Sequence, residues 1–215
     1  EAPVHAGTYE VKVSVPQNGD YEAAEATKSY TISKADAVVA ITSVTSTYNG
    51  KPAAVSATVT LVNNETYTGA IEYSYRLAGS DAEYTPGIPV NAGSYETKAT
   101  VQDFGDYNGA SVTGTWTINP QEIKVSGITA SSKTYDGDTA VTFDTTKAVL
   151  AGMVAGDELT VSAEGAFTDS NAGTGKNISI TSLSLGGAAA SNYVLATEGQ
   201  QSGTTADIDP KEVIL

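Results

Sequence analysis

Apolar and polar residues alternate along much of the chain. From Tyr9 to Val15, Tyr and Val occupy every second position, and Glu, Lys and Ser lie between them. The run 95–101 repeats this alternation with Tyr, Thr, Ala and Val. A period of two is typical of a β-strand with one buried face, because successive side chains point to opposite sides of the sheet. Thr, Val, Ile and Tyr dominate such runs and pack well on a pleated surface, so the sequence predicts an all-β fold.

Recurrent turn signals separate these runs. The tetrapeptides 48–51 and 135–138 contain Asn-Gly and Asp-Gly pairs, which favour the type I′ turn of a β-hairpin. An Ala-Gly pair precedes a predicted strand three times, at 6–7, 92–93 and 172–173. One segment departs from the alternation: residues 146–159 cluster Ala, Val, Leu and Met, and this composition predicts one short helix as the alternative to strands.

The chain contains an internal repeat. Residues 3–34 align with residues 89–120 without a gap, at a constant shift of 89 − 3 = 86 positions, and 15 of the 32 aligned positions are identical. A looser third copy follows, with Asn-Ala-Gly at 171–173, Asn-Tyr at 192–193 and a closing run at 206–210. Self-similarity at a fixed period indicates duplication of one folding unit, and this unit has the length of a small domain.

Short polar breaks mark the unit boundaries. Two of the three breaks contain Pro, which cannot donate a hydrogen bond to a central β-ladder, and the breaks lie at 33–36, 119–122 and 209–212. They predict half a unit at 1–34, a complete unit at 35–120, a second complete unit at 121–210 and the start of a further unit at 211–215. We therefore expect tandem small β domains in an elongated array. An Ig-like β-sandwich and a β-grasp-like sheet both fit such strands.

The charge balance narrows the expected partners. Eleven Lys and Arg against 25 Asp and Glu give a formal net charge of −14. Nucleic acids and anionic membrane surfaces are held by basic side chains, so we expect neither as a partner. No apolar stretch is long enough to span a bilayer, so we expect no membrane insertion in this segment. The absence of Cys excludes disulfides, thiolate metal sites and a cysteine nucleophile.

His5 is the single histidine, so a histidine-based triad or metal site would depend on it. Its repeat equivalents are Asn91 and Asn171, which favours a role in a turn. We therefore expect no catalytic residues, no metal site and no cofactor, and we expect that the protein is not an enzyme. Structural calcium at the acidic loops 136–138 and 156–158 is an alternative, since carboxylates are calcium ligands, but no complete motif supports it.

Three tyrosines are candidates for a ligand or partner surface. Tyr73 and Tyr75 lie two positions apart on one predicted strand and therefore share one of its faces, and Tyr84 is the third candidate. Trp116, the only Trp, is expected to be buried instead, because its repeat equivalent Tyr30 lies on the core-facing side of the closing strand.

A second set of tyrosines follows the repeat. These residues end the Gly-Asp-Tyr or Asn-Tyr motif of each copy, and they are Tyr21, Tyr107 and Tyr193. Because they recur together with the predicted fold, we expect them to pack beneath a loop and to stabilise each unit.

The ordered motifs carry a family resemblance. With Tyr48-Asn49-Gly50, then 89–96 and the closing Thr-Ile-Asn-Pro at 117–120, residues 35–120 resemble the MBG domain of bacterial extracellular proteins. Residues 1–34 resemble the C-terminal half of a further MBG copy. Residues 121–210 resemble the related YDG domain, through Lys-Thr-Tyr-Asp-Gly at 133–137, the run 150–157 and Asn-Tyr-Val-Leu at 192–195.

The resemblance implies a non-catalytic structural or adhesive module. Such tandem domains belong to large secreted or surface-anchored bacterial proteins, so we expect an extracellular location and a stalk or spacer that presents a binding region. Neighbouring repeats of the same chain are then expected partners. The alternative is a module that binds carbohydrate or a host protein, and a carboxylate-based glycoside hydrolase accessory region is a further alternative with no pair of acids to support it.

Overall fold

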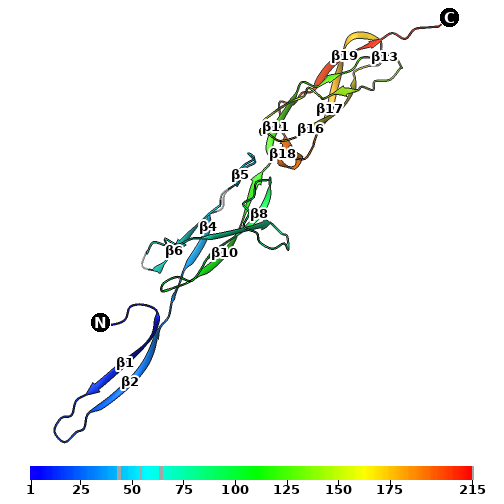
Figure 1. The fold of residues 1–215 in the computed structure, drawn as a ribbon. Coiled ribbons are helices and arrows are strands. Elements are labelled where there is room, and N and C mark those ends of the chain that lie inside the picture. The colour runs from blue at the N-terminus through cyan, green and yellow to red at the C-terminus, as the bar shows by residue number, and fades with distance from the viewer. Residues whose placement is uncertain (43–44, 54, 63–64, 215) are drawn as a thin grey trace. The chain divides into compact units, whose positions relative to one another are not determined.

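The structure is a computed structural model that describes residues 1–42, 45–53, 55–62 and 65–214. It consists mostly of β-strands arranged in small sheets (Figure 1), which confirms the predicted all-β fold. Helical structure in these ranges is confined to short 3₁₀ turns such as η2 (Ala190–Asn192). No helix of the described residues is long and apolar enough to cross a membrane.

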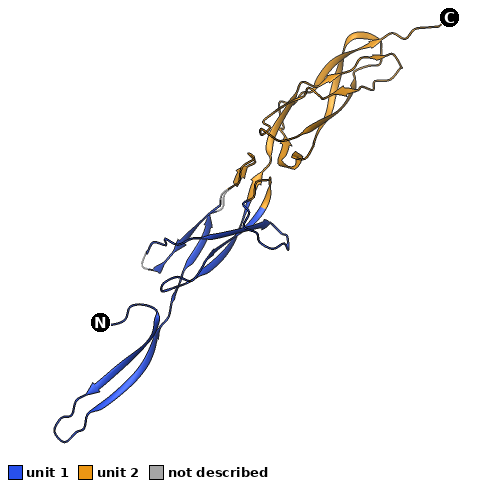
Figure 2. Ribbon diagram, in the orientation of Figure 1, with its two compact units in different colours: residues 1–44, 54–88, 95–116 blue, residues 45–53, 89–94, 117–215 orange. Residues whose placement is uncertain are grey.

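Two compact units share the chain (Figure 2). Unit 1 contains residues 1–44, 54–88 and 95–116, and unit 2 contains residues 45–53, 89–94 and 117–215. Unit 2 therefore holds not only the C-terminal 99 residues but also the segments 45–53 and 89–94, which precede them by tens of positions.

Unit 1 begins with a long hairpin. Strand β1 (Gly7–Val15) pairs antiparallel with β2 (Ala24–Ile32), from Gly7 opposite Ile32 to Val15 opposite Ala24 (Figure 1). The two strands form a two-stranded sheet, and nearly every residue of both is exposed. The hairpin contacts the rest of unit 1 at its base, through hydrogen bonds of His5, Ala6 and Lys34.

A four-stranded sheet follows, in the order β5-β10-β8-β7. Its strands are β5 (Thr45–Thr47), β7 (Glu72–Leu77), β8 (Gly93–Val101) and β10 (Ala110–Asn119). The short β5 runs parallel to β10, while β7 and β8 are antiparallel. Two smaller pairs complete this region: β3 (Ala35–Asp36) with β9 (Tyr107–Asn108), and β4 (Val38–Thr42) with β6 (Ser56–Thr60).

The C-terminal region has a second four-stranded sheet, in the order β13-β19-β17-β16. Its strands are β13 (Lys133–Thr134), β16 (Thr160–Phe167), β17 (Gly173–Gly186) and β19 (Gly203–Asp209). The remaining strands are β11 (Gln121–Ser126), β12 (Thr129–Ala130), β14 (Phe143–Asp144), β15 (Val149–Ala151) and β18 (Tyr193–Leu195). Strand β11 lies between β15 and β18, and β12 pairs with β14.

The two four-stranded sheets are connected in the same way. In each, a short strand pairs parallel to the closing strand, β5 to β10 and β13 to β19. A second parallel pair also recurs. Strand β3 pairs with β9, which starts at Tyr107, and β11 pairs with β18, which starts at Tyr193. Ala35 lies opposite Tyr107 and Gln121 lies opposite Tyr193, which are positions related by the 86-residue shift.

Alternation explains which faces are buried. Along β8, the side chains of Tyr95, Thr97, Ala99 and Val101 are buried, while the residues between them are partly exposed. Trp116 on β10 is buried, as predicted, and its indole N–H donates to the Thr97 hydroxyl over 2.7 Å. A separate cluster of buried side chains lies under the second sheet, and its members are Phe167, Ile178, Ala206 and Ile208.

Three local predictions are wrong. Residues 146–159 form no helix: the Asp144 carboxylate holds a turn at Thr146, and Gly152 and Gly156 adopt positive φ angles of 102° and 96°, which interrupt helical geometry. Residues 149–151, between this turn and Gly152, pair with β11 as β15.

The two predicted type I′ hairpins also do not form. The strands before these turns, β5 and β13, pair in parallel with the closing strands and not with the strand that follows. The Asn49 and Asp136 side chains instead accept hydrogen bonds from backbone N–H groups two residues on, at Lys51 and Asp138, and make Asx turns. The third wrong prediction is the packing of Tyr21, which is 80% exposed.

Candidate functional site

A polar cluster of unit 2 joins the Ala-Gly turn to the Asn-Tyr motif. The backbone N–H of Ala92 donates to the side-chain oxygen of Asn192 over 2.8 Å. The Asn192 amide nitrogen donates in turn to the side-chain oxygen of Asn91 over 3.2 Å. Asn192 is only 5% exposed. Because an unpaired buried amide destabilises a fold, these two bonds fix the turn on the motif.

Tyrosines reinforce this cluster. Tyr48 and Tyr193 meet edge to face with ring centroids 5.4 Å apart, and both hydroxyls donate to the carboxylate of Asp157, the Tyr48 hydroxyl over 2.9 Å. The Val154 N–H donates to the Tyr193 hydroxyl. Burial, with Asp157 next, raises the pKa of Tyr193 to about 12 and raises that of Tyr48 as well. Both phenols therefore stay protonated donors at neutral pH.

Unit 1 contains the same arrangement. The backbone N–H of Ala6 donates to Asp106 over 2.8 Å, and the His5 ring nitrogen lies 2.7 Å from the second oxygen of that carboxylate. Both contacts span the same sequence separations as their counterparts in unit 2, 100 and 101 residues. His5 takes the place of Asn91, and Asp106 the place of Asn192. The structure thus places His5 in a turn, and a carboxylate–imidazole pair replaces the amide pair.

The tyrosine that follows each Asp or Asn is anchored in the same way. The Tyr107 hydroxyl donates to Glu65 over 2.8 Å, as the Tyr193 hydroxyl does to Asp157. Tyr107 and Tyr193 are each 6% exposed. The prediction that these two residues pack beneath a loop is therefore confirmed.

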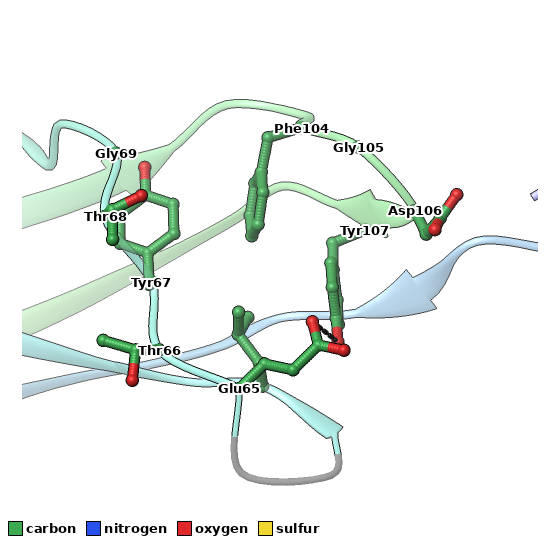
Figure 3. Close-up of a pocket in the computed structure, with 10 residues that line it drawn as sticks. Glu65, Thr66, Tyr67, Thr68, Gly69, Phe104, Gly105, Asp106 and Tyr107 are labelled. Atoms are coloured by element: carbon green, nitrogen blue, oxygen red, sulfur yellow. Dashed lines mark hydrogen bonds between the residues drawn. The ribbon is translucent and has the colours of Figure 1, made fainter. Parts of the chain in front are cut away.

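A pocket adjoins Tyr107 in unit 1 (Figure 3). It has a volume of about 410 Å³ and exposes both aromatic rings and polar groups. Phe104 stacks on Tyr107 with centroids 5.2 Å apart, and Tyr67 lies 4.8 Å from Phe104. Figure 3 shows the Glu65 carboxylate beside the Tyr107 hydroxyl, which donates a hydrogen bond to it. The sequence interpretation missed Tyr67 and Phe104, because neither belongs to the repeated motif.

The three candidate tyrosines occupy different environments. Tyr75 is 4% exposed, and its ring meets Trp116 edge to face, so it offers little surface to a ligand. Tyr73 is partly buried, and its hydroxyl accepts the Ala57 N–H over 2.9 Å. The Tyr84 hydroxyl donates to Glu96, and the Arg76 guanidinium lies over the Tyr84 ring at 4.5 Å. Ligand binding by Tyr73, Tyr75 and Tyr84 stays a prediction.

The acidic loops have partners of their own. Lys133 lies 2.8 Å from the Asp136 carboxylate and 2.5 Å from that of Asp138, and it lowers the pKa of both carboxyl groups. Asp157 is held by two tyrosines, as described above. Among the described residues, no group of three or more His, Cys, Asp or Glu is placed to hold a metal ion.

Comparison with known proteins identifies one domain. Residues 119–202 match the model of the YDG domain, which agrees with the resemblance of residues 121–210. No curated protein and no solved structure matches the chain. The YDG match includes Asn192, which binds the Ala-Gly turn of unit 2, and Asp157 and Tyr193, which are joined by a hydrogen bond.

Proposed function

We propose that the chain is a non-catalytic structural module of tandem β repeats, in which residues 35–120 form an MBG-type domain and residues 1–34 the C-terminal half of another. Its role is that of a stalk or spacer in a large bacterial surface or secreted protein, where it presents an adhesive binding region. One observation carries this proposal: the same turn-to-motif contact occurs twice, at identical sequence separations.

A repeated junction suits a spacer. Each junction ties one repeat to the next through a partly buried hydrogen bond, Ala6 to Asp106 and Ala92 to Asn192. Beside it, the receiving repeat forms a short parallel strand pair of its own, β3 with β9 or β11 with β18. Because the connecting segments are only a few residues long, neighbouring repeats are restricted in their bending. In such an array stability is the sum of the repeats and of the contacts between neighbours. The length and stiffness of the spacer then depend on the junctions between repeats, and no catalytic group is needed.

Small-angle scattering of the full chain in solution tests the proposal. We expect an elongated particle with a narrow distribution of lengths, and Asn192→Ala should broaden that distribution by removing the acceptor of the Ala92 N–H. Asn171→Ala is the matched control, since it truncates an exposed asparagine in the equivalent turn. A compact particle, or equal behaviour of the two variants, would contradict a spacer that depends on its junctions.

A second function is favoured by the pocket of Figure 3. Aromatic faces beside hydroxyl and carboxylate groups suit a sugar or an extended peptide, and Tyr67 and Phe104 supply such faces here. The chain would then bind carbohydrate or a host protein directly. A glycan array and Tyr67→Ala test this alternative, with Tyr135→Ala as the control outside the pocket; an array without binding would remove its support.

A further inference from the structure

The Ala-Gly turn occurs three times in the chain, and the third copy is open. Ala6 and Ala92 are half-buried, and their N–H groups are bound by Asp106 and Asn192. Their equivalent, Ala172, is exposed, as are its neighbours Asn171 and Gly173. The Ala N–H group of the turn is therefore bound by a side chain in the first two copies, whereas the turn residues of the third copy are exposed.

The residues around the third turn repeat those of the engaged junction. Tyr135 occupies the place of Tyr48 in the repeat, yet it is 40% exposed where Tyr48 is 5% exposed. Tyr135, Asn171 and Ala172 line a cavity of about 660 Å³ together with the segment 210–213. Tyr135, Ala172 and Val213 expose apolar surface there, and a contiguous apolar patch is typical of an interaction surface.

The segment after Pro210 also lacks the cover that its counterparts have. Val213 takes the repeat position of Ile123, which is fully buried, and of Ala37, which is 5% exposed. Both counterparts lie at the start of a repeat, where the first strand pairs in parallel with the strand that begins at the Tyr of that same repeat. Val213 is 83% exposed and belongs to no strand.

We infer that the surface formed by Tyr135, Asn171, Ala172 and Val213 is a docking site for the Asn-Tyr loop of a further β repeat of the YDG kind. The asparagine of that loop would accept the Ala172 N–H and donate to Asn171, as Asn192 does with Ala92 and Asn91. We expect an Asn and not an Asp at this position of the loop. In the first junction the Asp106 carboxylate faces a histidine, whereas at the third turn it would face the Asn171 amide, next to the carboxylate of Asp169. The inference rests on the proposed function, since it requires tandem repeats.

An extended chain tests the inference. In this chain a second copy of residues 121–215 replaces 211–215, so that the sequence Pro210-Gln121 reproduces the native Pro120-Gln121 junction. Amide hydrogen exchange of Ala172 is then compared with that in the original chain, and Ala92 serves as the internal reference. We expect Ala172 to exchange roughly five- to tenfold more slowly in the extended chain, because it gains a hydrogen bond.

Variants of the added copy separate the docking contact from general crowding. The residue equivalent to Asn192 in that copy is changed to Ala, which should return Ala172 to its original rate, or to Asp, which keeps an acceptor oxygen and should preserve most of the protection. Unchanged exchange at Ala172, with Ala92 still protected, would overturn the inference and leave the spacer proposal intact. Concentration-dependent protection of Ala172 in the original chain would instead identify a second copy as the occupant and would also overturn it. Failure of the spacer proposal itself appears separately, as a compact particle in scattering.

Discussion

The hairpin β1–β2 and the strands β8 and β10 show what one sequence pattern becomes with and without a covering layer. The two segments share their alternation and nearly half of their residues. Yet Val13 and Val15 are 56% and 58% exposed, while their equivalents Ala99 and Val101 are almost completely buried. Tyr21 is 80% exposed, and its equivalent Tyr107 is 6% exposed.

The difference arises from residues 35–88, which lie between the two aligned segments 3–34 and 89–120. In the complete repeat β8 is flanked by β7, and Val39 on β4 packs against Ala99 and Val101. The described part of unit 1 supplies no such elements to β1 and β2, which pair only with each other. Strand formation is therefore encoded locally, by alternation, whereas burial is contributed by β4 and β7, which lie within residues 35–88.

The largest expected effect is obtained by placing ahead of the hairpin the residues that precede its equivalents β8 and β10 in the chain. A chain with residues 35–88 placed ahead of Pro3 reproduces the native order, because Pro3 and Pro89 are equivalent. An isolated two-stranded hairpin is marginally stable, so amide exchange in β1 should slow by roughly a thousandfold or more once its edges and face are covered. Hydrogen exchange measured by NMR reports each strand separately.

A flexible Gly-Ser segment of the same length ahead of Pro3 is the control for this addition. It should leave exchange in β1 unchanged. Equal rates with residues 35–88 and with the flexible segment would show that the exposure of the hairpin has another origin.

Truncation of an equivalent aromatic pair sharpens the comparison. Trp116 is 4% exposed and contacts Tyr75 and Tyr95, whereas its equivalent Tyr30 is 38% exposed. Trp116→Ala should lower the free energy of unfolding by about 3–5 kcal/mol, because it leaves a large cavity. Tyr30→Ala should cost less than about 1 kcal/mol, since no packed core is lost. Denaturant unfolding followed by circular dichroism measures both, and comparable losses would contradict the comparison.

A smaller effect is expected at the buried hydroxyl beneath Trp116. Thr97 is fully buried and accepts the indole N–H, while its equivalent Val11 already lacks a hydroxyl and is 46% exposed. Thr97→Val should destabilise by about 1–3 kcal/mol, because the indole N–H loses its acceptor. Thr97→Ser keeps the acceptor and should cost less. Unfolding followed by fluorescence is suitable here, since Trp116 is the only Trp.

The sequence predicted those features of the fold that depend on local signals and not those that depend on distant residues. Alternation and β propensity are local signals, and they predicted strands over 9–15 and 95–101, which lie in β1 and β8. The partners of β5 and β13 are closing strands some 70 residues away. No local signal reports such parallel pairing, so the Asx-Gly turns at 49–50 and 136–137 were interpreted as hairpin turns.

The junctions could be predicted only in part. The recurrence of Ala-Gly and of Asn-Tyr was visible, and the interpretation of His5 as a turn residue relied on it. That the first motif docks on the second required the structure, because the two are separated by 100 residues. Tyr67 and Phe104 occur once each, so no repetition singled out the pocket of Figure 3.

The smallest effect concerns pH, and it distinguishes the two junctions. The Asp106 carboxylate, through its hydrogen bond, raises the pKa of His5 above its ordinary value of 6.5, and His5 together with the Ala6 N–H lowers the pKa of Asp106 below 3.8. Lys34, which also pairs with Asp103, is the other charged group that acts on Asp106. Between the lowered pKa of Asp106 and pH 6.5, both groups are charged and the contact is complete. It weakens as the pH rises through the raised pKa of His5, because the imidazole loses its charge. At low pH it is lost as Asp106 protonates.

An NMR titration of His5 and of the Ala6 amide checks this behaviour, and the imidazole signals are unambiguous because the chain has one histidine. We expect both signals to change together above pH 6.5, while the Ala92 amide stays constant, since Asn91 and Asn192 do not titrate. Asp106→Asn should bring the pKa of His5 back toward 6.5, and His5→Asn should make the first junction as insensitive to pH as the second. If His5 titrates at or below its ordinary value in the unchanged chain, the carboxylate does not engage it in solution, and the equivalence of the two junctions then depends on the Ala6 N–H alone.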